Sequence, residues 1–441
     1  MLTTPLAFAF VLGVLVFVHE LGHFLAARRL GVRVLTFSLG FGPKLLKTTR
    51  GDTEYCISLI PLGGYVKMAG DSPDDPARTG QPDEFLSKTK WERFQVLIMG
   101  PLMNIILAVV VMAIVLAQGA EVPVYEDQPP TIGAVEPESP AERAGIQPGD
   151  LILSVGGDPV NTWEDLFLAI GTRPDRDVSI TLRRAGQTQS VSVRPTSDTR
   201  FEIGDIGVLP DIDPIVASVI AGEPAERAGL KAGDVVLAVD GKRMVTRANL
   251  IEEISGSGGR EIELTIQRGD QQLQIKATPE QRGDRALLGV FVTEPTRSFT
   301  PGPLEAIGLS VQKNIEFSGL IFRTLGGLFV GDTSPRQLMG PVAIAQLSGE
   351  SAAAGWIALF SLMASISLNL GLLNLMPIPV LDGGHILIMA LEGVARRDFS
   401  YAVKEKMLMA GFAVLMMLMV TVIYNDLTRI AWIERLMPWR N

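Results

Sequence analysis

Two histidines and a glutamate near the start of the chain have the spacing of a metal-binding motif. His19, Glu20 and His23 form the sequence His-Glu-x-x-His inside an apolar run from residue 5 to residue 30. On an α-helix the two imidazoles lie one turn apart on one face and can share a metal ion, while the glutamate can hold a water bound to that ion. Ionisable side chains are costly in an apolar helix of this length and are rare there without a functional reason. The motif therefore predicts a zinc site.

A short amphipathic helix with two partly exposed histidines is the alternative interpretation of this motif. Such a helix needs polar residues over much of its surface. The residues that precede the motif, 10–12 and 14–17, are apolar all round. We therefore favour a membrane helix that carries a metal site.

The composition indicates a membrane protein with a polar region attached. The 441 residues are enough for about two to four structural units, and the 47% that are hydrophobic are unevenly distributed. The net charge of −9 argues against a nucleic-acid partner. Cys56 is the single cysteine, so the chain can form neither an intramolecular disulfide nor a cysteine zinc cluster. The candidate imidazole ligands are few: His19, His23 and His385.

Four apolar runs have the length of a transmembrane helix. They cover residues 6–30, 96–118, 356–376 and 407–424. The first run has no basic stretch before it and no small-residue cleavage site after it, so we expect a retained helix and not a signal peptide. Basic residues follow the first run and lie between the third and fourth runs. The positive-inside rule then places both of these loops in the cytoplasm and the long middle region on the far side.

The third apolar run ends in a sequence that interrupts a helix. Pro377, Pro379 and the glycine pair 383–384 must unwind it inside or near the bilayer. Asp382 lies in the unwound part, where a carboxylate needs a cation or strong donors. Added to the two histidines, Asp382 would leave one position for water, which is the pattern of catalytic zinc. His385 is the competing third ligand. We favour Asp382 because it adjoins the break, and expect His385 to support the ligands from outside or to cap the helix.

Two segments between the first and second runs carry further signals. Residues 31–70 alternate between apolar and polar types and contain several glycines, which predicts short strands beside the first helix, at membrane depth. Residues 71–83 predict an acidic surface loop. The second run opens with Gly100, Pro101 and Asn104. Asn104 needs a polar partner inside the membrane, either at a contact between helices or at the active site.

From residue 121 to about residue 297 the chain is polar and repeats itself. Residues 140–155 match residues 224–239 at a constant offset, since 229 − 145 = 84 and 234 − 150 = 84. Each copy predicts a short helix, a Gly-Asp turn, an apolar strand, a longer helix and an alternating strand. The signature Ala-Gly-x-x-x-Gly-Asp resembles that of bacterial PDZ domains, which bind extended peptides by adding a strand. The alternative is a pair of spacers that bind nothing.

These motifs together resemble the site-2 protease family of intramembrane zinc metalloproteases, in the branch that carries two PDZ domains. The resemblance covers nearly the whole chain. Besides the repeat, it rests on His-Glu-x-x-His at 19–23, Gly-Pro-x-x-Asn at 100–104 and Asn-Leu-Met-Pro-x-Pro-x-Leu-Asp-Gly-Gly at 374–384. The resemblance implies one zinc ion per chain, with His19, His23 and Asp382 as ligands and Glu20 as the catalytic base.

The resemblance also implies substrates and a location. Asn374, with Pro377 and Pro379, would hold the substrate backbone, and residues 31–70 would present an edge strand to it. The family cleaves single-pass membrane proteins within the bilayer, after an earlier cut has removed most of the ectodomain. This branch releases the cytoplasmic part of an anti-sigma factor and degrades remnant signal peptides. The expected location is the bacterial inner membrane, with the PDZ domains in the periplasm and the active site near the cytoplasmic side.

The expected fold class is a polytopic α-helical membrane protein with about four transmembrane helices, a membrane-associated β segment and an inserted α+β tandem PDZ region. An amphipathic helix, residues 304–328, is expected to lie along the outer membrane surface. The expected segments are a first transmembrane helix (1–30), a cytoplasmic or membrane-associated β region with a loop (31–95), a second transmembrane helix (96–120), a first and a second PDZ domain (121–200 and 201–297), a periplasmic amphipathic linker (298–354), a third transmembrane helix (355–395) and a fourth transmembrane helix with a C-terminal tail (396–441).

Two other classes of protein share some of these features. A non-catalytic membrane scaffold would use the PDZ pair alone, and it would have no use for Glu20 beside the metal. A zinc-dependent transporter would be expected to show an inverted repeat of helices, and the four apolar runs show none. An intramembrane protease is therefore the function that the sequence supports best.

Overall fold

The structure is a computed structural model, and it describes residues 3–71, 79–197, 203–283, 285–330, 333 and 338–428. The chain divides into two compact units. The first contains Met1–Gly119, Thr300–Gly331 and Leu338–Asn441, and the second is built on Ala120–Phe299. The acidic loop expected at 71–83 lies mostly outside the described residues.

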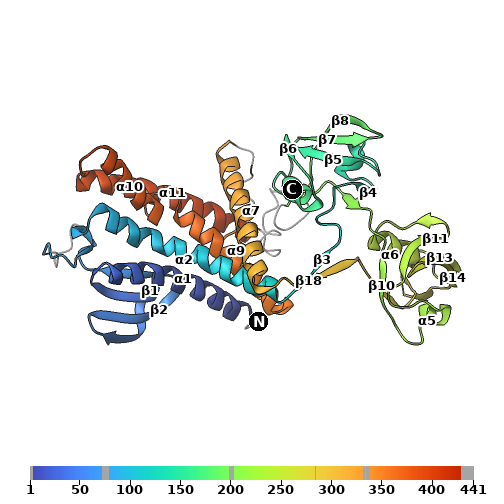
Figure 1. The fold of residues 1–441 in the computed structure, drawn as a ribbon, viewed down its shortest axis with the longest axis horizontal. Helices are drawn as coiled ribbons and strands as arrows, with labels where there is room; N and C mark the ends of the chain where they lie inside the picture. Colours follow the sequence, from blue (N-terminus) through green and yellow to red (C-terminus); the bar gives the residue numbers. More distant parts are fainter. Residues whose placement is uncertain are drawn as a thin grey trace. The chain divides into compact units, whose positions relative to one another are not determined.

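The first unit consists of long helices and one β-hairpin (Figure 1). Its elements are α1 (Thr3–Arg29), β1 (Val34–Arg50), β2 (Thr53–Met68), the 3-10 helix η1 (Phe85–Ser87), α2 (Lys90–Ala117), α7 (Pro303–Val330), α8 (Pro341–Ala354), α9 (Trp356–Asn374), α10 (Asp382–Val394) and α11 (Tyr401–Thr428). Within the described residues, four helices are long and apolar enough to cross a membrane, and they coincide with the four predicted runs: α1, α2, α9 and α11.

Helices α1, α2 and α9 pack together through apolar side chains. The buried residues at the centre of this contact are Val11, Leu15, Val111, Met112, Met363 and Ala364. Helix α2 begins at a capping box, in which the Thr89 hydroxyl accepts from the Glu92 backbone N–H and the Glu92 carboxylate accepts from Thr89. The predicted interruption of the third run is present, because α9 ends at Asn374 and α10 begins at Asp382.

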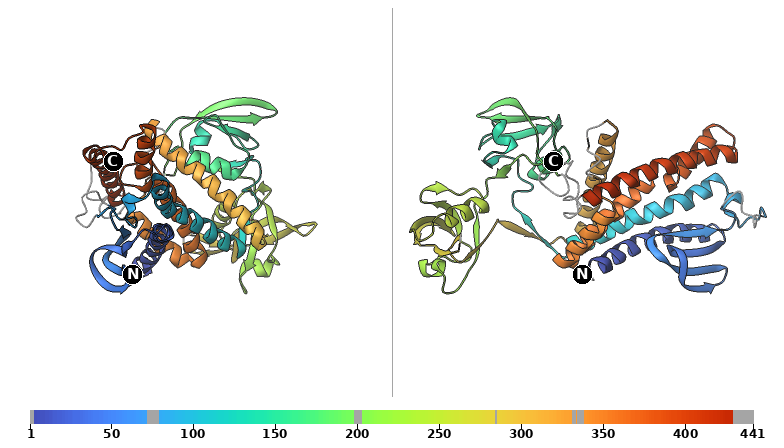
Figure 2. Two further views of the ribbon diagram at one scale, coloured as in Figure 1. Left: turned by 60° about the vertical axis from the view of Figure 1, so that its left-hand side comes forward. Right: turned by 180° about the vertical axis from the view of Figure 1, so that it is seen from behind.

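The β1–β2 hairpin lies along α1 (Figures 1 and 2). It consists of two long strands, where the sequence predicted several short ones. Residues 36–39 of β1 pair on one side with residues 54–57 of β2 and on the other side with residues 64–67. Because β2 bends around β1 in this way, residues 64–67 form an edge of the hairpin among the described residues.

Helix α7 covers residues 304–328, where the sequence predicted an amphipathic helix. It packs against α2 and α9, a contact that the sequence did not predict, and its expected place along the outer membrane surface stays a prediction. The Ser310 hydroxyl is fully buried and donates to the backbone carbonyl of Val109, 2.7 Å away, and Phe317 packs among the buried side chains between α2 and α9. Small polar side chains that find backbone acceptors on a neighbouring helix allow this contact.

Helix α8 is fixed at its start by the last membrane helix. Asp426 of α11 is 2% exposed and accepts backbone N–H groups of Gly340, Val342 and Ala343, each at 3.0 Å. These N–H groups have no partner within their own helix, so a carboxylate from another helix caps them and interacts favourably with the helix dipole. Nothing in the local sequence of residues 339–343 revealed this partner.

The second unit contains two copies of one arrangement of strands and helices. The first repeat consists of β4 (Ile132–Val135), α3 (Pro140–Arg143), β5 (Leu151–Val155), β6 (Asp158–Pro159), α4 (Trp163–Gly171), β7 (Val178–Arg184), β8 (Gln187–Val193) and β9 (Val208–Pro210). The second consists of β10 (Ile215–Val219), α5 (Pro224–Ala228), β11 (Val235–Val239), β12 (Lys242–Arg243), α6 (Arg247–Ser255), β13 (Ile262–Arg268), β14 (Gln271–Ala277), β15 (Glu280–Arg282), β16 (Arg285–Leu287) and β17 (Val290–Thr293). Strands β3 (Ala120–Pro123) and β18 (Thr296–Phe299) pair with each other at the ends of the unit.

The boundary between the repeats lies later than the sequence suggested. Strand β9 pairs with β4, just as β17 pairs with β10 in the second repeat. The first repeat therefore recruits residues 208–210, beyond the expected boundary at residue 200. The pairing forms a two-stranded sheet from residues far apart in sequence, which a linear repeat search does not detect.

The Gly-Asp turn of each repeat is held by an arginine from the end of a strand. Arg184 donates to both carboxylate oxygens of Asp150, at 2.7 and 2.6 Å, and to the carbonyl of Gly145. Arg268 makes the same contacts to Asp234, and the offset is again 268 − 184 = 84. Burial acts to raise the pKa of Asp150, but the Arg184 guanidinium and the backbone N–H of Gln147 together outweigh it and hold that pKa below its usual range. The glycine and aspartate of the signature are thus parts of one ion-paired turn.

Candidate metal centre

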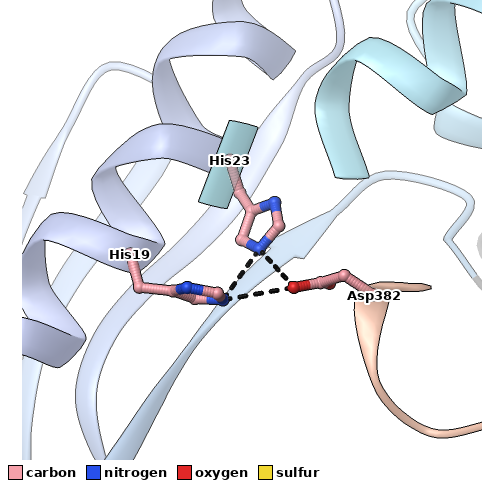
Figure 3. Close-up of side chains that lie close together, drawn as sticks. All are labelled: His19, His23 and Asp382. Atoms are coloured by element: carbon pink, nitrogen blue, oxygen red, sulfur yellow. Dashed lines mark hydrogen bonds and ion pairs between the residues drawn. The ribbon is translucent and has the colours of Figure 1, made fainter. Parts of the chain in front are cut away.

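Three candidate ligands from α1 and α10 meet at one point of the first unit. His19 and His23 lie one turn apart on α1 and Asp382 is the first residue of α10, and their side chains converge (Figure 3). The two Nε2 atoms are 3.2 Å apart, and Asp382 Oδ2 lies 3.3 Å from His19 Nε2 and 3.5 Å from His23 Nε2. The side chains of His19, His23 and Asp382 are 11%, 9% and 18% exposed.

These separations fit a tetrahedral zinc ion. Ligand atoms at about 2.0–2.1 Å from a tetrahedral centre lie about 3.3 Å from one another. The three observed distances, 3.2, 3.3 and 3.5 Å, bracket that value. Three protein ligands leave a fourth position open, as in catalytic zinc sites. The donor set of two imidazoles and one carboxylate also suits zinc.

Helix α2 contacts both imidazoles at their Nδ1 atoms, on the side of each ring away from the candidate metal position. His23 Nδ1 lies 2.8 Å from the carbonyl oxygen of Val96, and His19 Nδ1 lies 3.2 Å from the side-chain amide of Asn104. A histidine that binds metal through Nε2 carries its proton on Nδ1, so each Nδ1 must donate to an acceptor. The Val96 carbonyl supplies one acceptor directly.

The amide of Asn104 supplies the other acceptor when its oxygen faces His19. Asn104 is fully buried, and with its nitrogen toward the imidazole the oxygen Oδ1 has no partner among the described residues. Oxygen and nitrogen of an amide have nearly the same shape, so the hydrogen-bond network decides their assignment. We therefore assign Oδ1 to the His19 side, where it accepts the Nδ1 proton.

Close contact between α1 and α2 depends on Gly100. A Cβ at this position would lie 2.6 Å from His23 Cε1 and closer still to Nε2. Any side chain would therefore displace the imidazole from the candidate site. The glycine of the Gly-Pro-x-x-Asn motif is thus required by the ring of His23, which the sequence did not reveal.

Glu20 faces the edge of the β-hairpin. A Cβ at Gly64, in the edge segment of β2, would lie 2.9 Å from Glu20 Cγ and 2.8 Å from Val16 Cγ1. The backbone of β2 therefore passes directly beside the Glu20 side chain. This arrangement brings a strand edge and a carboxylate to one location next to the three candidate ligands.

The chain was compared with known proteins. Residues 7–418 match peptidase family M50. The chain belongs to this family. It is 33% identical to a Neisseria meningitidis protein named "Putative zinc metalloprotease", over 97% of this chain and 99% of that protein. It is 34% identical to the regulator of sigma-E protease RseP of Salmonella typhimurium, over 96% of this chain and 98% of that protein. A solved PDZ domain from Listeria monocytogenes is similar to 20% of this chain and 92% of its own, at 22% identity and a TM-score of 0.18.

These findings confirm the resemblance to the site-2 protease family. The M50 peptidase is a metalloprotease, and its membrane character agrees with the four apolar helices. His385, the alternative third ligand, is exposed and is not part of the cluster of metal-binding side chains found among the described residues. That cluster consists of His19, His23 and Asp382.

The candidate substrate-binding residues of the M50 peptidase lie next to this cluster in the chain. Asn374 ends α9, and Pro377 and Pro379 lie in the non-helical segment that leads to α10. Pro377 is exposed, whereas Pro379 packs against Gly411 of α11. Their role in holding a substrate stays a prediction.

Sequence reasoning missed two groups that position the site. The first is the Val96 carbonyl, because a backbone acceptor leaves no signal in residue type. The second is Ser367 of α9, whose buried hydroxyl donates to the backbone carbonyl of Asn104 at 2.7 Å. Ser367 and Gly371 form a small-x-x-x-small pair, which is the signal that would have indicated a close contact between helices.

Proposed function

We propose that this M50 peptidase is a zinc-dependent intramembrane protease that cleaves transmembrane segments of single-pass membrane proteins. The observation that carries the proposal is the spacing of 3.2 to 3.5 Å among the three ligand atoms, with Glu20 beside them. The name of the Neisseria relative supports zinc as the ion. His19 and His23 belong to a candidate membrane-spanning helix, which supports a reaction inside the bilayer.

The residues of the site divide the work of peptide hydrolysis. When bound, zinc lowers the pKa of a coordinated water to about 7 and polarises a carbonyl group. Glu20, as general base, accepts a proton from the attacking water and later donates it to the leaving amine. Asn104 and the Val96 carbonyl keep the proton of each imidazole on Nδ1, so that both Nε2 atoms face Asp382.

The substrate must unwind before it can react, because a peptide bond in a helix is shielded by its own hydrogen bonds. Edge residues 64–67 lie beside Glu20 and can pair with an extended segment, which would satisfy the backbone groups released by unwinding. Asn374, Pro377 and Pro379 would hold the same segment from the other side. This arrangement favours an extended, strand-like substrate at the reacting bond.

We also propose a biological setting. The name of the Salmonella relative supports an anti-sigma factor as one substrate, and remnant signal peptides are a second expected class. The setting is the bacterial inner membrane, with the active site near the cytoplasmic side. The shared order of strands and helices in the two repeats, and the ion-paired Gly-Asp turn in each, support a tandem pair of PDZ domains.

The two repeats are proposed to limit access and to take no part in the chemistry. Residues 121–297 contain no histidine, and the region is too polar to enter hydrocarbon. A periplasmic pair of folded domains would obstruct a substrate with a bulky ectodomain and admit one that has been trimmed. A non-catalytic PDZ scaffold is the alternative function, and it predicts that Glu20 is dispensable.

Cleavage of a one-helix substrate in membranes tests the proposal. Glu20→Gln should retain zinc but lose cleavage, because the ligands remain and the base is gone. His19→Ala and Asp382→Ala should lose zinc as well, and His385→Ala serves as the control that keeps zinc and most of the activity. Unchanged cleavage by Glu20→Gln would favour the scaffold. Loss of zinc in His385→Ala, with zinc retained in Asp382→Ala, would mean that the third ligand is wrongly assigned.

The same assay tests the role of the repeats. A substrate that keeps a folded outer domain should be cut more slowly than one trimmed to a short stub. Equal rates for the two substrates would show that the repeats do not restrict access.

A further inference from the structure

We propose that Gly411 of α11 is a positioning residue, which sets the place of the ligand loop (residues 375–381) and, through it, of Asp382. The inference rests on the proposed zinc site. Gly411 is buried, and a Cβ there would lie 2.5 Å from Pro379 Cβ, 2.8 Å from the Pro379 carbonyl carbon and closer still to the carbonyl oxygen. Ordinary contacts of a Cβ begin near 3.4 Å, so a methyl group at this position requires a displacement of about 1 Å.

This contact is unusual within α11. The buried residues of this helix are Gly411, Asn425, Asp426 and Thr428, so Gly411 is the one buried residue of positions 401–424, whose other residues are exposed or partly buried. Small residues let membrane helices approach one another closely, but the atoms nearest Gly411 belong to a loop and not to another helix. The contact therefore has to be explained by what it touches, which is the backbone of the ligand loop.

Helix α11 is restrained on both sides of Gly411. Toward its start, Lys404 donates to the buried carboxylate of Glu392 on α10, at 2.7 Å. Toward its end, Asp426 caps α8. Because contacts near both ends hold α11 in place, its middle resists displacement. An added methyl group at Gly411 should therefore displace the ligand loop and not the helix.

The ligand loop has little freedom to absorb such a displacement. Val380 has a φ of 96°, a conformation that a β-branched residue adopts only when its surroundings impose it. The loop also touches the start of α10, since a Cβ at Gly384 would lie 2.6 Å from Pro379 Cα. Movement of Pro379 is therefore transmitted to α10 and to its first residue, Asp382.

The consequence is a change at the metal ligands. Asp382 Oδ2 lies 3.3 and 3.5 Å from the two Nε2 atoms, close to the spacing that a tetrahedral ion requires. A shift of about 1 Å opens these distances beyond what three ligands of one ion can share, and misplacements of this size cost about 100-fold in rate. Gly411 acts on the reaction through Pro379 and Asp382 and touches neither metal nor substrate.

The test compares Gly411→Ala with two glycine controls in the purified full-length protein. Gly13→Ala, in α1, adds a methyl group with nothing within 4 Å. Gly340→Ala adds one that meets Asp426 Oδ2 at 2.5 Å, which disturbs the packing of α11 away from the ligand loop. The measurements are Zn²⁺ affinity by chelator competition, the absorption spectrum of the Co²⁺-substituted protein, and kcat and KM on a trimmed substrate.

We expect Gly411→Ala to weaken Zn²⁺ binding by about 10- to 100-fold, to change the Co²⁺ spectrum and to lower kcat more than it raises KM. Gly13→Ala should match the wild type, and Gly340→Ala should lower the unfolding temperature with an unchanged Co²⁺ spectrum. A wild-type spectrum and affinity in Gly411→Ala would overturn the proposal, and so would an equal spectral change in Gly340→Ala.

A double-mutant cycle covers the case in which Gly411→Ala folds poorly. Pro379→Gly removes the Cβ, one of the three Pro379 atoms that the new methyl group meets, and frees the backbone that carries the other two to move, so the double variant is relieved of part of the clash. The effects of the two substitutions on Zn²⁺ affinity should be non-additive by at least about tenfold, because the residues share one contact. Additive effects would contradict the inference. A wild-type protein that binds no Zn²⁺ would instead refute the proposed function, and this inference with it.

Discussion

Replacing Asn104 tests whether α2 fixes the proton of His19. Asn104→Leu keeps nearly the same volume but removes the acceptor that we assign to His19 Nδ1, 3.2 Å away. The residue is fully buried, so water cannot take the place of the amide. The hydrogen bond from Ser367 survives, because it goes to the backbone carbonyl of residue 104.

The expected loss can be estimated from the unsatisfied donor. A buried N–H left without an acceptor costs about 1–3 kcal/mol, which corresponds to about 5- to 150-fold in zinc affinity. Loss of a group that orients a metal ligand typically costs about 10- to 100-fold, in agreement with this range. Asn104→Asp restores an acceptor and should therefore bind zinc more tightly than Asn104→Leu.

Chelator competition on the purified protein measures these affinities. Asn314→Leu is the matched control, since Asn314 is also a buried asparagine of the first unit, and its side-chain amide donates within α7, to Ser310. Zinc affinity in Asn104→Leu equal to that of the control would refute the reasoning. Weaker binding by Asn104→Asp than by Asn104→Leu would show that the amide nitrogen, and not its oxygen, faces His19.

Two further predictions concern the membrane orientation and the repeats. A cysteine at Arg194, which is 63% exposed in the first repeat, should react with a membrane-impermeant thiol reagent in spheroplasts, and one at Asp398, which is 72% exposed, should stay protected until the membrane is opened; the reverse pattern would invert the proposed topology. Arg184→Ala and Arg268→Ala should each destabilise one repeat by about 3 kcal/mol in denaturant unfolding, because each leaves a buried carboxylate without its partner. The pKa of Asp150 is lowered in the folded state, so the carboxylate contributes stability above its unfolded pKa of about 4. This contribution is lost as the pH falls through the folded pKa. The destabilisation caused by Arg184→Ala should therefore become smaller in acid.

Residue type and spacing were sufficient to predict which side chains the structure brings together at the candidate metal centre. His19 and His23 are recognisable because two histidines four residues apart are rare on an apolar helix that binds no metal. Asp382 is recognisable because prolines and glycines mark the break in which it lies. The structure brings these three side chains together from opposite ends of the chain. The membrane helices were predictable for the same reason, since a long apolar run is a strong signal.

The contacts that position these groups could not be predicted in the same way. The cap that Asp426 provides for α8 joins residues more than 80 positions apart and depends on backbone N–H groups, which every residue except proline possesses. The amphipathic pattern of residues 304–328 predicted the helix α7 but not its packing against α2 and α9, because such a pattern shows that a helix has two faces and does not show what covers them. Pairing of β9 with β4 likewise joins residues that are far apart in sequence, and no local pattern of residue types indicates it.

The position of α2 explains why the metal motif of α1 is not sufficient by itself. In an aqueous site, water could accept the Nδ1 protons of both histidines, but an apolar environment offers no such acceptor. Helix α2 therefore has to supply two acceptors, and it does so with the Val96 carbonyl and the Asn104 side chain. It can approach closely enough only because Gly100 leaves space for the ring of His23. The Gly-Pro-x-x-Asn motif is thus the structural counterpart of His-Glu-x-x-His, and a change in either should disable the same site.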